Sequence, residues 1–418
     1  MGRAGVGLGA GVGPDAGGTA AAGVRRGVLP RPAAFAAIGL VLGAVLVAAS
    51  APTPLYPVWQ ARFGFSPTTL TVIFAVYAAA LLAALLLTGA LSDRVGRRPV
   101  LLAALAALAA AMAVFALTDS VTGLVVARIL QGVGTGVATG TLSATLLDLQ
   151  PREGSGPLVS TVAPSFGLAA GALLAGALVQ HGPAPRQLVF WLLLAVFAAA
   201  AAAVLAVPET VPYDPGWRRA LRPRVGVPAG ARSTFLLVGP LIGAAWALAG
   251  FYLSLGPSLV ELLAGSSDRL VGALPGVALF AAGGVASLVT MAWPPRRALL
   301  VGAPMLVAGV LITLGGLAAD QLWLYVLGSA AAGAGFGPAF VGALRTLAPL
   351  VATTERAALL TTVYVLSYVC FSAPAVLAGA ATTRFGLRGT ADVYAAAVAV
   401  VAAVAAGGFA LRARRRFS

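Results

Sequence analysis

Twelve apolar segments, each close to the length of one bilayer crossing, constrain the fold of this chain more than any other feature. About 20 apolar residues in a helix cross the hydrocarbon core. Strands are not expected, because backbone groups in lipid must be bonded within a helix or a closed barrel, and no ten-residue alternation is present. The pattern predicts an all-α polytopic membrane protein with twelve transmembrane helices. They comprise residues 34–55, 69–91, 99–118, 121–147, 158–180, 188–207, 234–257, 269–291, 298–318, 322–345, 357–380 and 390–411.

Composition excludes an ordinary soluble protein. Hydrophobic residues make up 60% of the 418 residues, and charged residues make up only 9%. A soluble domain has no interior large enough to bury that much apolar surface. The net charge of +15 would suggest nucleic acid in a soluble protein. Here the arginines lie in short loops and tails, so orientation in the bilayer explains them better, and no nucleic-acid partner is expected.

The arginines also predict which side of the membrane each loop faces. All 27 basic residues are arginines, and 21 of them lie in the tails and in loops on the same side as the N-terminus. Five lie on the opposite side, and Arg128 lies inside a span. By the positive-inside rule, both termini are predicted to be cytoplasmic, in a multi-pass protein of the plasma membrane.

A polar, proline-rich and basic linker divides the spans into two groups of six. Two pseudo-symmetric halves are typical of secondary transporters. The predicted units are a disordered cytoplasmic tail (1–33), an N-terminal six-helix half (34–207), the cytoplasmic linker (208–233), a C-terminal six-helix half (234–411) and a basic cytoplasmic tail (412–418).

The loop between the second and third spans carries an acid within a basic cluster. Asp93 at a helix end can pair with Arg97, and Asp148 closes the fourth span on the same face. An ion pair at a seam between helices is a plausible latch, since separating the helices would leave both charges without a partner.

Two further features of this loop support a constrained turn. Gly89 is expected to let a helix end approach its neighbour, and Gly96 permits a turn that a side chain would obstruct. The alternative to the latch is that Arg94, Arg97 and Arg98 only anchor the topology.

The fourth span carries a charge that requires an explanation. A charge inside the membrane is costly unless it faces protein or water. Helical periodicity places Arg128, Gln131, Thr135 and Thr139 on one stripe, which is expected to face a cavity or the bundle interior. Arg128 is interpreted as a structural hydrogen-bond hub, a substrate anchor or a part of proton coupling.

An adjacent stripe on the same span consists of Gly132, Gly136 and Gly140. Small residues at this spacing allow close helix packing in membranes. Aromatic residues mark candidate cavity walls elsewhere: Tyr77 on the second span, Trp246 on the seventh, and Tyr364 and Tyr368 on the eleventh.

Several kinds of chemistry find no support in the sequence. The chain has one cysteine and one histidine, so neither a disulfide nor a metal cluster is expected. No nucleotide-binding motif is present, and no acid lies at the centre of a span. A nucleophile–base pair or metal ligands inside the membrane would indicate an enzyme, and neither is found. A cavity with one arginine and no acid favours a neutral or anionic substrate over a cation.

Three stretches resemble signatures of the major facilitator superfamily. Residues 89–98 match its loop signature, Gly-x-Leu-x-Asp-Arg-x-Gly-Arg-Arg, at every characteristic position. Residues 128–134 are similar to its fourth-helix motif, Arg-x-x-Gln-Gly. Residues 167–176 resemble its fifth-helix antiporter motif, with Ala172 in place of proline and Ala175 in place of glycine.

The resemblance implies a fold of two six-helix halves over about residues 34–411. It also implies that Asp93, Arg97 and Asp148 form a latch favouring the outward-open state. Gly167, Gly171 and Gly176 are expected to be helix-packing positions, and an exporter is favoured.

Secondary active transport by alternating access is therefore the expected function. We expect proton-coupled efflux of a hydrophobic or amphiphilic small molecule by a monomer in the lipid bilayer, with a proton gradient and no cofactor. Uptake or uniport of a sugar or an organic acid is the alternative. A non-transporting membrane receptor or enzyme is the alternative of a different class.

Overall fold

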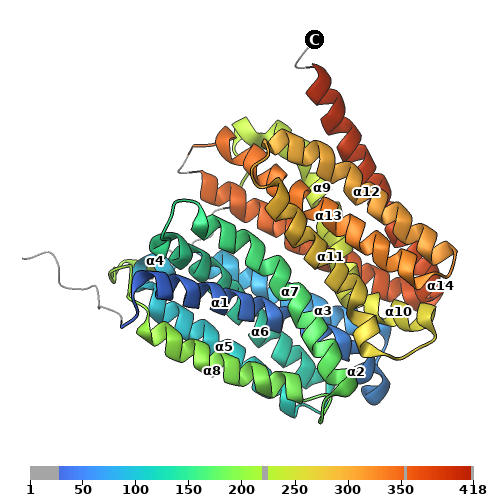
Figure 1. Cartoon of the computed structure of the whole chain (residues 1–418), viewed down its shortest axis with the longest axis horizontal. Coiled ribbons are helices and arrows are strands. Elements are labelled where there is room, and N and C mark those ends of the chain that lie inside the picture. The colour runs from blue at the N-terminus through green and yellow to red at the C-terminus, as the bar shows by residue number, and fades with distance from the viewer. Residues whose placement is uncertain (1–27, 219–224, 353–354, 416–418) are drawn as a thin grey trace, which may run out of the picture.

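The computed structural model describes residues 28–218, 225–352 and 355–415, and helices are its only regular elements in these ranges (Figure 1). The predicted disorder of the N-terminal tail falls on residues that lie, up to residue 27, outside the described ranges.

The N-terminal half contains six long helices and three short ones. The long helices are α1 (Arg31–Ser50), α3 (Pro67–Thr88), α5 (Arg97–Leu117), α6 (Val121–Leu149), α7 (Ser155–His181) and α8 (Leu188–Ala206). The short ones are the 3-10 helix η1 (Thr53–Leu55), α2 (Tyr56–Phe63) and α4 (Ser92–Val95).

The C-terminal half repeats this plan. Its long helices are α9 (Ala229–Ser254), α11 (Arg269–Thr290), α12 (Pro295–Ala318), α13 (Leu322–Leu347) and α14 (Arg356–Arg415). The short helix α10 (Gly256–Ala264) continues α9 as α2 continues α1, and η3 (Ala348–Leu350) follows α13.

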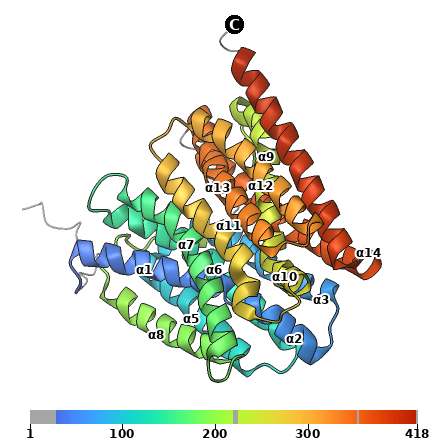
Figure 2. The same cartoon turned by 45° about the vertical axis from the view of Figure 1, so that its right-hand side comes forward.

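The structure confirms the predicted all-helical fold. The described residues contain eleven helical stretches that are long and apolar enough to cross a membrane. The last of these is α14, whose backbone leaves helical geometry at Gly386 (φ 72°, ψ 165°) and forms two arms (Figure 2). Twelve crossings result, six in each half.

Most helix ends differ from the predicted ones by a few residues, and three of these differences involve the predicted tails and linker. The first span begins at Arg31, because Pro32 is tolerated in the first helical turn. The seventh span begins at Ala229, within the predicted linker. Residues 412–415 of the predicted tail continue α14 as a helix, and the Arg412 guanidinium donates a hydrogen bond to the Ser233 carbonyl oxygen (3.3 Å).

A glycine repeat shows the pseudo-symmetry at the level of single residues. Three glycines of α6 recur in α13, each 201 positions later: Gly132, Gly134 and Gly136 match Gly333, Gly335 and Gly337. In each helix the outer two glycines face one neighbour (α3 or α11), and the middle glycine faces another (α5 or α12). A Cβ at any of these six positions would overlap with the neighbouring helix. The repeat therefore holds equivalent helix triplets at close approach in both halves.

The other predicted packing glycines divide into two groups. Gly167 and Gly171 of α7 lie against α1, and Gly176 lies against the Arg269 carbonyl of α11 in the other half. The prediction for Gly140 is wrong, because the nearest neighbouring atom, from Leu85, would be an ordinary 3.9 Å from an added Cβ.

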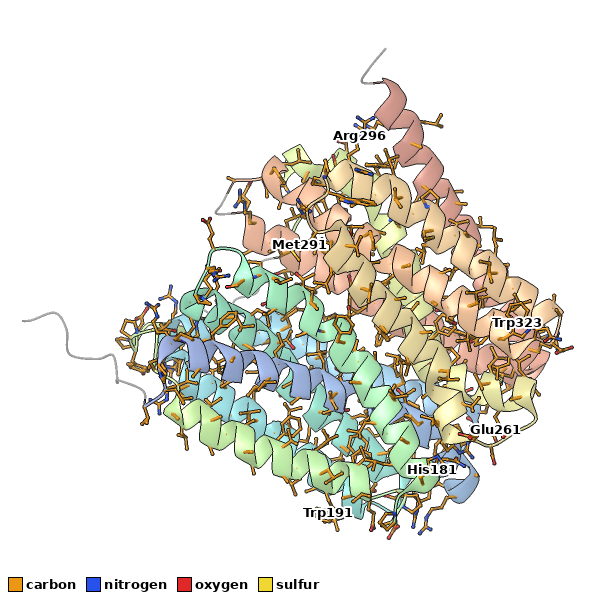
Figure 3. The ribbon with its side chains drawn as sticks, viewed as in Figure 1. His181, Trp191, Glu261, Met291, Arg296 and Trp323 are labelled. Carbon is orange, nitrogen blue, oxygen red and sulfur yellow. The ribbon has the colours of Figure 1, made fainter. Side chains whose placement is uncertain are left out.

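The two halves contact each other mainly through α3 with α14 and α7 with α11. Two hydrogen bonds join them near one end. The Thr68 hydroxyl donates to the Gly379 carbonyl (3.2 Å), and the Arg269 amide donates to the Gln180 side chain (2.9 Å). This end also carries His181 and Glu261, whereas Met291 and Arg296 lie at the opposite end (Figure 3). The halves thus meet at the predicted outer face, while α4 and the C-terminal end of α14 lie far apart (Figures 1 and 2).

The glycine repeat generates a stability prediction. Gly333→Leu should lower the free energy of unfolding by about 1–3 kcal/mol, because the new side chain overpacks the contact with α11. The matched control is Gly315→Leu on α12, where no atom lies within 4 Å of an added Cβ. The thermal unfolding temperature in detergent micelles measures the difference. Equal unfolding temperatures for the two variants would contradict close packing at Gly333.

Candidate functional site

The loop between α3 and α5 has a backbone that depends on Gly96. Gly96 adopts φ 106° and ψ 151°, and it directly precedes the first residue of α5. Only glycine takes this conformation without strain. The turn points the N-terminus of α5 towards the start of the linker. By contrast, the expected role of Gly89 is wrong, because an added Cβ there would meet only Leu85 of its own helix.

Arg97 is the centre of a polar network in this loop. Only 7% of the surface of this charged residue is exposed. The guanidinium donates to the Asp148 carboxylate from Nε (3.1 Å) and to the Ser92 hydroxyl from Nη1 (2.8 Å), and it forms an ion pair with Asp93. The structure therefore brings together the three residues that the sequence proposed as a latch.

Glu209 is a member of this site that the sequence did not single out. Its carboxylate accepts hydrogen bonds from the backbone amides of Arg97 (2.8 Å) and Arg98 (2.9 Å), which are the first two residues of α5. An anion at a helix N-terminus satisfies free amides and interacts favourably with the helix dipole. Glycine at position 96 leaves room for this carboxylate, since an added Cβ there would lie 2.9 Å from a Glu209 carboxylate oxygen.

Two further contacts fasten the beginning of the linker to the same loop. The Thr210 hydroxyl donates to the Asp148 carboxylate (2.8 Å), and the Asp214 amide donates to the Arg94 carbonyl (2.6 Å). Asp214 and Arg94 also form an ion pair. A signal for this docking was present in the sequence, because Glu209 follows the end of the sixth span, on the side where α5 begins.

Every partner named in this network belongs to the N-terminal half or to the linker. Arg98 donates to the Leu205 carbonyl at the end of α8, and Arg31 of α1 donates to the Asp148 carbonyl (3.0 Å). The network thus ties α1, α5, α6 and α8 together at one face. It is assembled while the opposite, predicted outer face is closed, which is not the outward-open state that the resemblance implies for it.

Arg128 lies in a second and more deeply buried centre, with 1% of its residue surface exposed. Its guanidinium donates to the Gln131 side-chain oxygen (2.6 Å), to the Ala49 carbonyl (3.4 Å) and to the Tyr56 hydroxyl. It also lies over the rings of Tyr56 and Tyr77, with distances of 5.3 and 5.1 Å from Cζ to the ring centroids. Among the described residues, no carboxylate pairs with it.

The rest of the predicted polar stripe follows the same face of α6. Gln131 and Thr135 are buried, and Gln131 donates to the Ala48 carbonyl (2.6 Å). Thr139 is half-buried and donates to the Thr135 carbonyl (2.7 Å). The stripe faces the bundle interior, which is the second of the two surroundings expected for Arg128.

Aromatic rings gather where the halves meet. Trp246 of α9 contacts the rings of Phe336, Phe340, Tyr368 and Phe371, with centroid distances between 5.4 and 5.9 Å. Phe371 in turn contacts Phe74 of the N-terminal half (4.8 Å). We call these six residues the aromatic cluster. The buried Nε1 of Trp246 has no hydrogen-bond partner within the described part of the chain.

Three of the four predicted cavity aromatics lie in or beside these two centres. Trp246 and Tyr368 belong to the aromatic cluster, and Tyr77 stacks on Arg128. Tyr364 is half-buried one turn before Tyr368, outside the ring contacts given above.

The glycine repeat aligns the aromatic cluster with the polar stripe. At the same spacing of 201 residues, Thr135 corresponds to Phe336 and Thr139 to Phe340. Arg128 corresponds to Ser329 and Gln131 to Ala332. The same helix face is therefore polar in one half and aromatic in the other. Within the described residues, no group of His, Cys, Asp and Glu could hold a metal ion.

Comparisons with known proteins agree with this architecture. The family model described as Major Facilitator Superfamily matches residues 38–303. No curated protein matches the chain in sequence.

Solved structures show the fold over most of the chain. A POT family transporter in complex with 5-aminolevulinic acid is 15% identical, with a TM-score of 0.69 over 90% of this chain and 95% of that chain. A POT family transporter in complex with a thioalcohol-conjugated peptide is 16% identical, with a TM-score of 0.67 over 89% and 94%. A mutant of the nucleoside transporter NupG is 11% identical, with a TM-score of 0.67 over 91% and 99%. At these identities the likeness concerns the fold alone.

The docking of Glu209 predicts a loss of stability on neutralisation. Glu209→Gln should lower the free energy of unfolding by about 1–3 kcal/mol, because it removes the negative charge at the N-terminus of α5 and leaves one acceptor oxygen for the two amides. Glu153→Gln, at an exposed acid in the loop before α7, is the matched control. Thermal unfolding in detergent compares them, and an unchanged unfolding temperature for Glu209→Gln would show that the contact contributes little.

Proposed function

The chain belongs to the major facilitator superfamily and is a transmembrane transporter, and we propose that it exports amphiphilic small molecules in exchange for protons. The family and the fold are those of transporters rather than enzymes. In this proposal the protein acts as a monomer in the plasma membrane, with both termini cytoplasmic. It uses the proton gradient and no cofactor.

One observation carries the substrate class. The equivalent faces of α6 and α13 differ in chemistry, with threonines in one half and phenylalanines in the other. Thr139 and Phe340 are half-buried, whereas Arg128 and Gln131 are sealed in this conformation. A site between such walls suits a molecule with an apolar body and a polar group. The unpaired indole N–H of Trp246 would donate to an oxygen of that polar group.

The aromatic cluster also supports alternating access. Phe74 and Phe371 belong to different halves and lie 4.8 Å apart. Rocking of one half against the other must separate or rotate these rings. Substrate bound beside them would therefore be sensitive to the state of the transporter.

We further propose that Asp93, Arg97 and Asp148 act as a conformational latch. Arg97 is more costly to leave unpaired than to pair, because its side chain is almost fully buried between the two carboxylates. Gly96, Arg94 and Arg98 would serve this latch by shaping its turn and by holding the linker.

Transport of an organic acid is the second candidate. It is favoured by Arg128, which meets only neutral acceptors and aromatic rings among the described residues. A negatively charged substrate group would complement this charge if alternation exposed it.

Transport into proteoliposomes tests the proposal. With an acidic interior, protons leaving the vesicle should drive accumulation of an amphiphilic substrate, screened over neutral and anionic amphiphiles and over organic acids. Protein-free vesicles and vesicles treated with a proton ionophore are the controls. Equilibration of the substrate across the membrane at a rate and to a level independent of the pH gradient would exclude obligatory proton coupling. Accumulation of organic acids alone would favour the second candidate.

The indole donor generates a separate prediction. Trp246→Phe retains a ring in the aromatic cluster but removes the N–H, so the KM for the exported amphiphile should rise by about 3- to 10-fold. Trp191→Phe on α8, where the side chain is exposed, is the matched control. Transport kinetics in proteoliposomes measure both, and equal KM values would place the substrate away from Trp246.

A further inference from the structure

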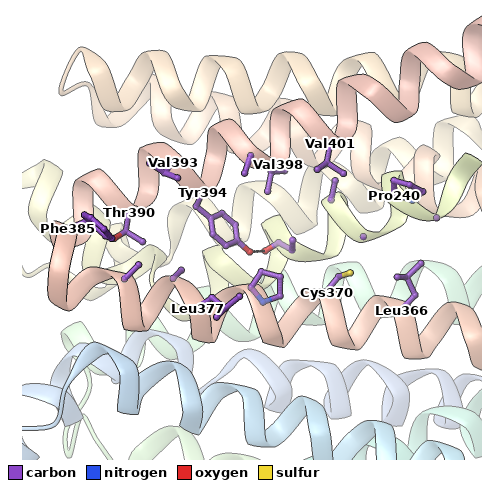
Figure 4. Close-up of a pocket in the computed structure, with 18 of the residues that line it drawn as sticks. Pro240, Leu366, Cys370, Leu377, Phe385, Thr390, Val393, Tyr394, Val398 and Val401 are labelled. Atoms are coloured by element: carbon purple, nitrogen blue, oxygen red, sulfur yellow. Dashed lines mark hydrogen bonds between the residues drawn. The ribbon is translucent and has the colours of Figure 1, made fainter. Parts of the chain in front are cut away.

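A long groove lies on the side of the C-terminal half, apart from the aromatic cluster. It runs between α9 and the two arms of α14 and has a volume of about 910 Å³ (Figure 4). Along α14 its wall extends from Leu366 to Phe385, which is about 28 Å at 1.5 Å per residue. This length is close to the full thickness of the hydrocarbon core, about 30 Å, so an acyl chain from one leaflet would occupy about half of it.

Small residues on α9 make the groove hollow. Gly239, Gly243 and Ala247 line it opposite Leu366, Cys370 and Pro374. Neighbouring residues of α9 face different sites, since Ala247 lines the groove and Trp246 contacts the aromatic cluster. The groove is therefore not the substrate site proposed above.

The hydroxyl groups along the groove are already bonded to the protein. The Tyr394 hydroxyl donates to the Ala247 carbonyl (2.7 Å), and the Thr390 hydroxyl donates to the Gly386 carbonyl (2.7 Å). The remaining polar side-chain atom on the wall is the Cys370 thiol, which is a weak hydrogen-bonding group. A polar ligand would lose its hydration here without gaining hydrogen bonds, whereas a hydrocarbon chain would lose nothing.

The mouth of the groove opens to the bilayer. Leu377 and Val393, on the two arms of α14, are 70% and 72% exposed. Both lie well inside a helical stretch that is long and apolar enough to cross the membrane. Hydrocarbon chains of lipids therefore surround the opening.

A positive charge lies at the end of the groove where the arms meet. Arg384 is exposed and lies beside the ring of Phe385, a wall residue, with 5.8 Å from Cζ to the ring centroid. Nearby Arg388 forms an ion pair with Asp320. Arg384 forms no ion pair within the ranges that the structure describes. Its guanidinium is thus available to a phosphate at the level of the lipid headgroups.

We propose that this groove binds one acyl chain of an anionic phospholipid, with the lipid phosphate on Arg384. The apolar wall and the bonded hydroxyl groups select a hydrocarbon chain, and the charge selects the headgroup. The bound lipid would fill the space between α9 and α14, the helices that carry Trp246, Tyr368 and Phe371 of the aromatic cluster.

Lipid binding is tested by native mass spectrometry of the purified protein titrated with phosphatidylglycerol or phosphatidylcholine. The wild type should retain one phosphatidylglycerol with at least a fivefold preference over phosphatidylcholine. Arg384→Gln should reduce this preference to less than twofold while a lipid is still bound. An equal preference in the wild type and in Arg384→Gln would overturn the headgroup assignment.

A matched pair of variants tests the chain site. Ala396 and Ala397 are both exposed on the second arm of α14, but only Ala397 lines the groove. Ala397→Phe should weaken binding of the retained lipid at least tenfold, and Ala396→Phe should leave it unchanged. Thermal unfolding without added lipid checks that both variants are folded. Equal lipid retention by the two variants would overturn the proposal.

Cross-linking locates the chain independently of any variant. A phosphatidylglycerol with a diazirine in its acyl chain should label wild-type α14 or α9 at groove residues. Labelling confined to helices of the N-terminal half would overturn the proposal.

Discussion

The structure depends on one constraint, which is that backbone polar groups in the hydrocarbon must be bonded inside the protein, most of them within their own helix. Apolar side chains then gain little by leaving lipid for protein, so the helices associate through close packing. The six glycines shared by α6 and α13 meet this requirement at equivalent points of the two halves. Because each glycine faces the backbone of a neighbouring helix, these positions set the spacing within α3, α5 and α6 in one half. The equivalent positions do the same for α11, α12 and α13 in the other half.

Within this framework the chain holds two buried arginines in different ways. Arg97 lies at a helix end and is neutralised by Asp93 and Asp148, next to the anionic cap that Glu209 provides. Arg128 lies inside a span and is held by a hydroxyl, an amide, a carbonyl and aromatic rings. The first arrangement is a closed electrostatic network that stiffens one face. The second leaves a net positive charge inside the protein, which a moving proton or an anionic substrate would influence.

The sequence predicted the fold well because span length, arginine distribution and the position of the linker each depend on the bilayer itself. It also predicted the contacts of Asp93 with Arg97 and of Arg97 with Asp148, since all three lie at helix ends on one face. It missed Glu209, because the position of an acid just after the sixth span does not by itself specify the surface on which the linker docks. It assigned close packing to Gly140 from spacing alone, whereas the separation of α6 from α3 at that level depends on the helix crossing. The groove between α9 and α14 could not be predicted from the sequence either, because it depends on the bend at Gly386 and on how the two arms of α14 diverge.

The internal repeat shows that the candidate site residues lie where the two halves differ. Positions that place the backbone are retained across the 201-residue spacing, as the glycines show. Positions that face the interior have diverged, so that Arg128, Gln131, Thr135 and Thr139 correspond to Ser329, Ala332, Phe336 and Phe340. A duplicated half needs identical packing to pair with its neighbours, but a route for the amphiphile proposed above needs unlike walls to hold its unlike ends. Under that proposal, differences between the repeats at interior positions are candidate substrate contacts, and Thr139 and Phe340, half-buried on opposite halves, are the next positions to examine.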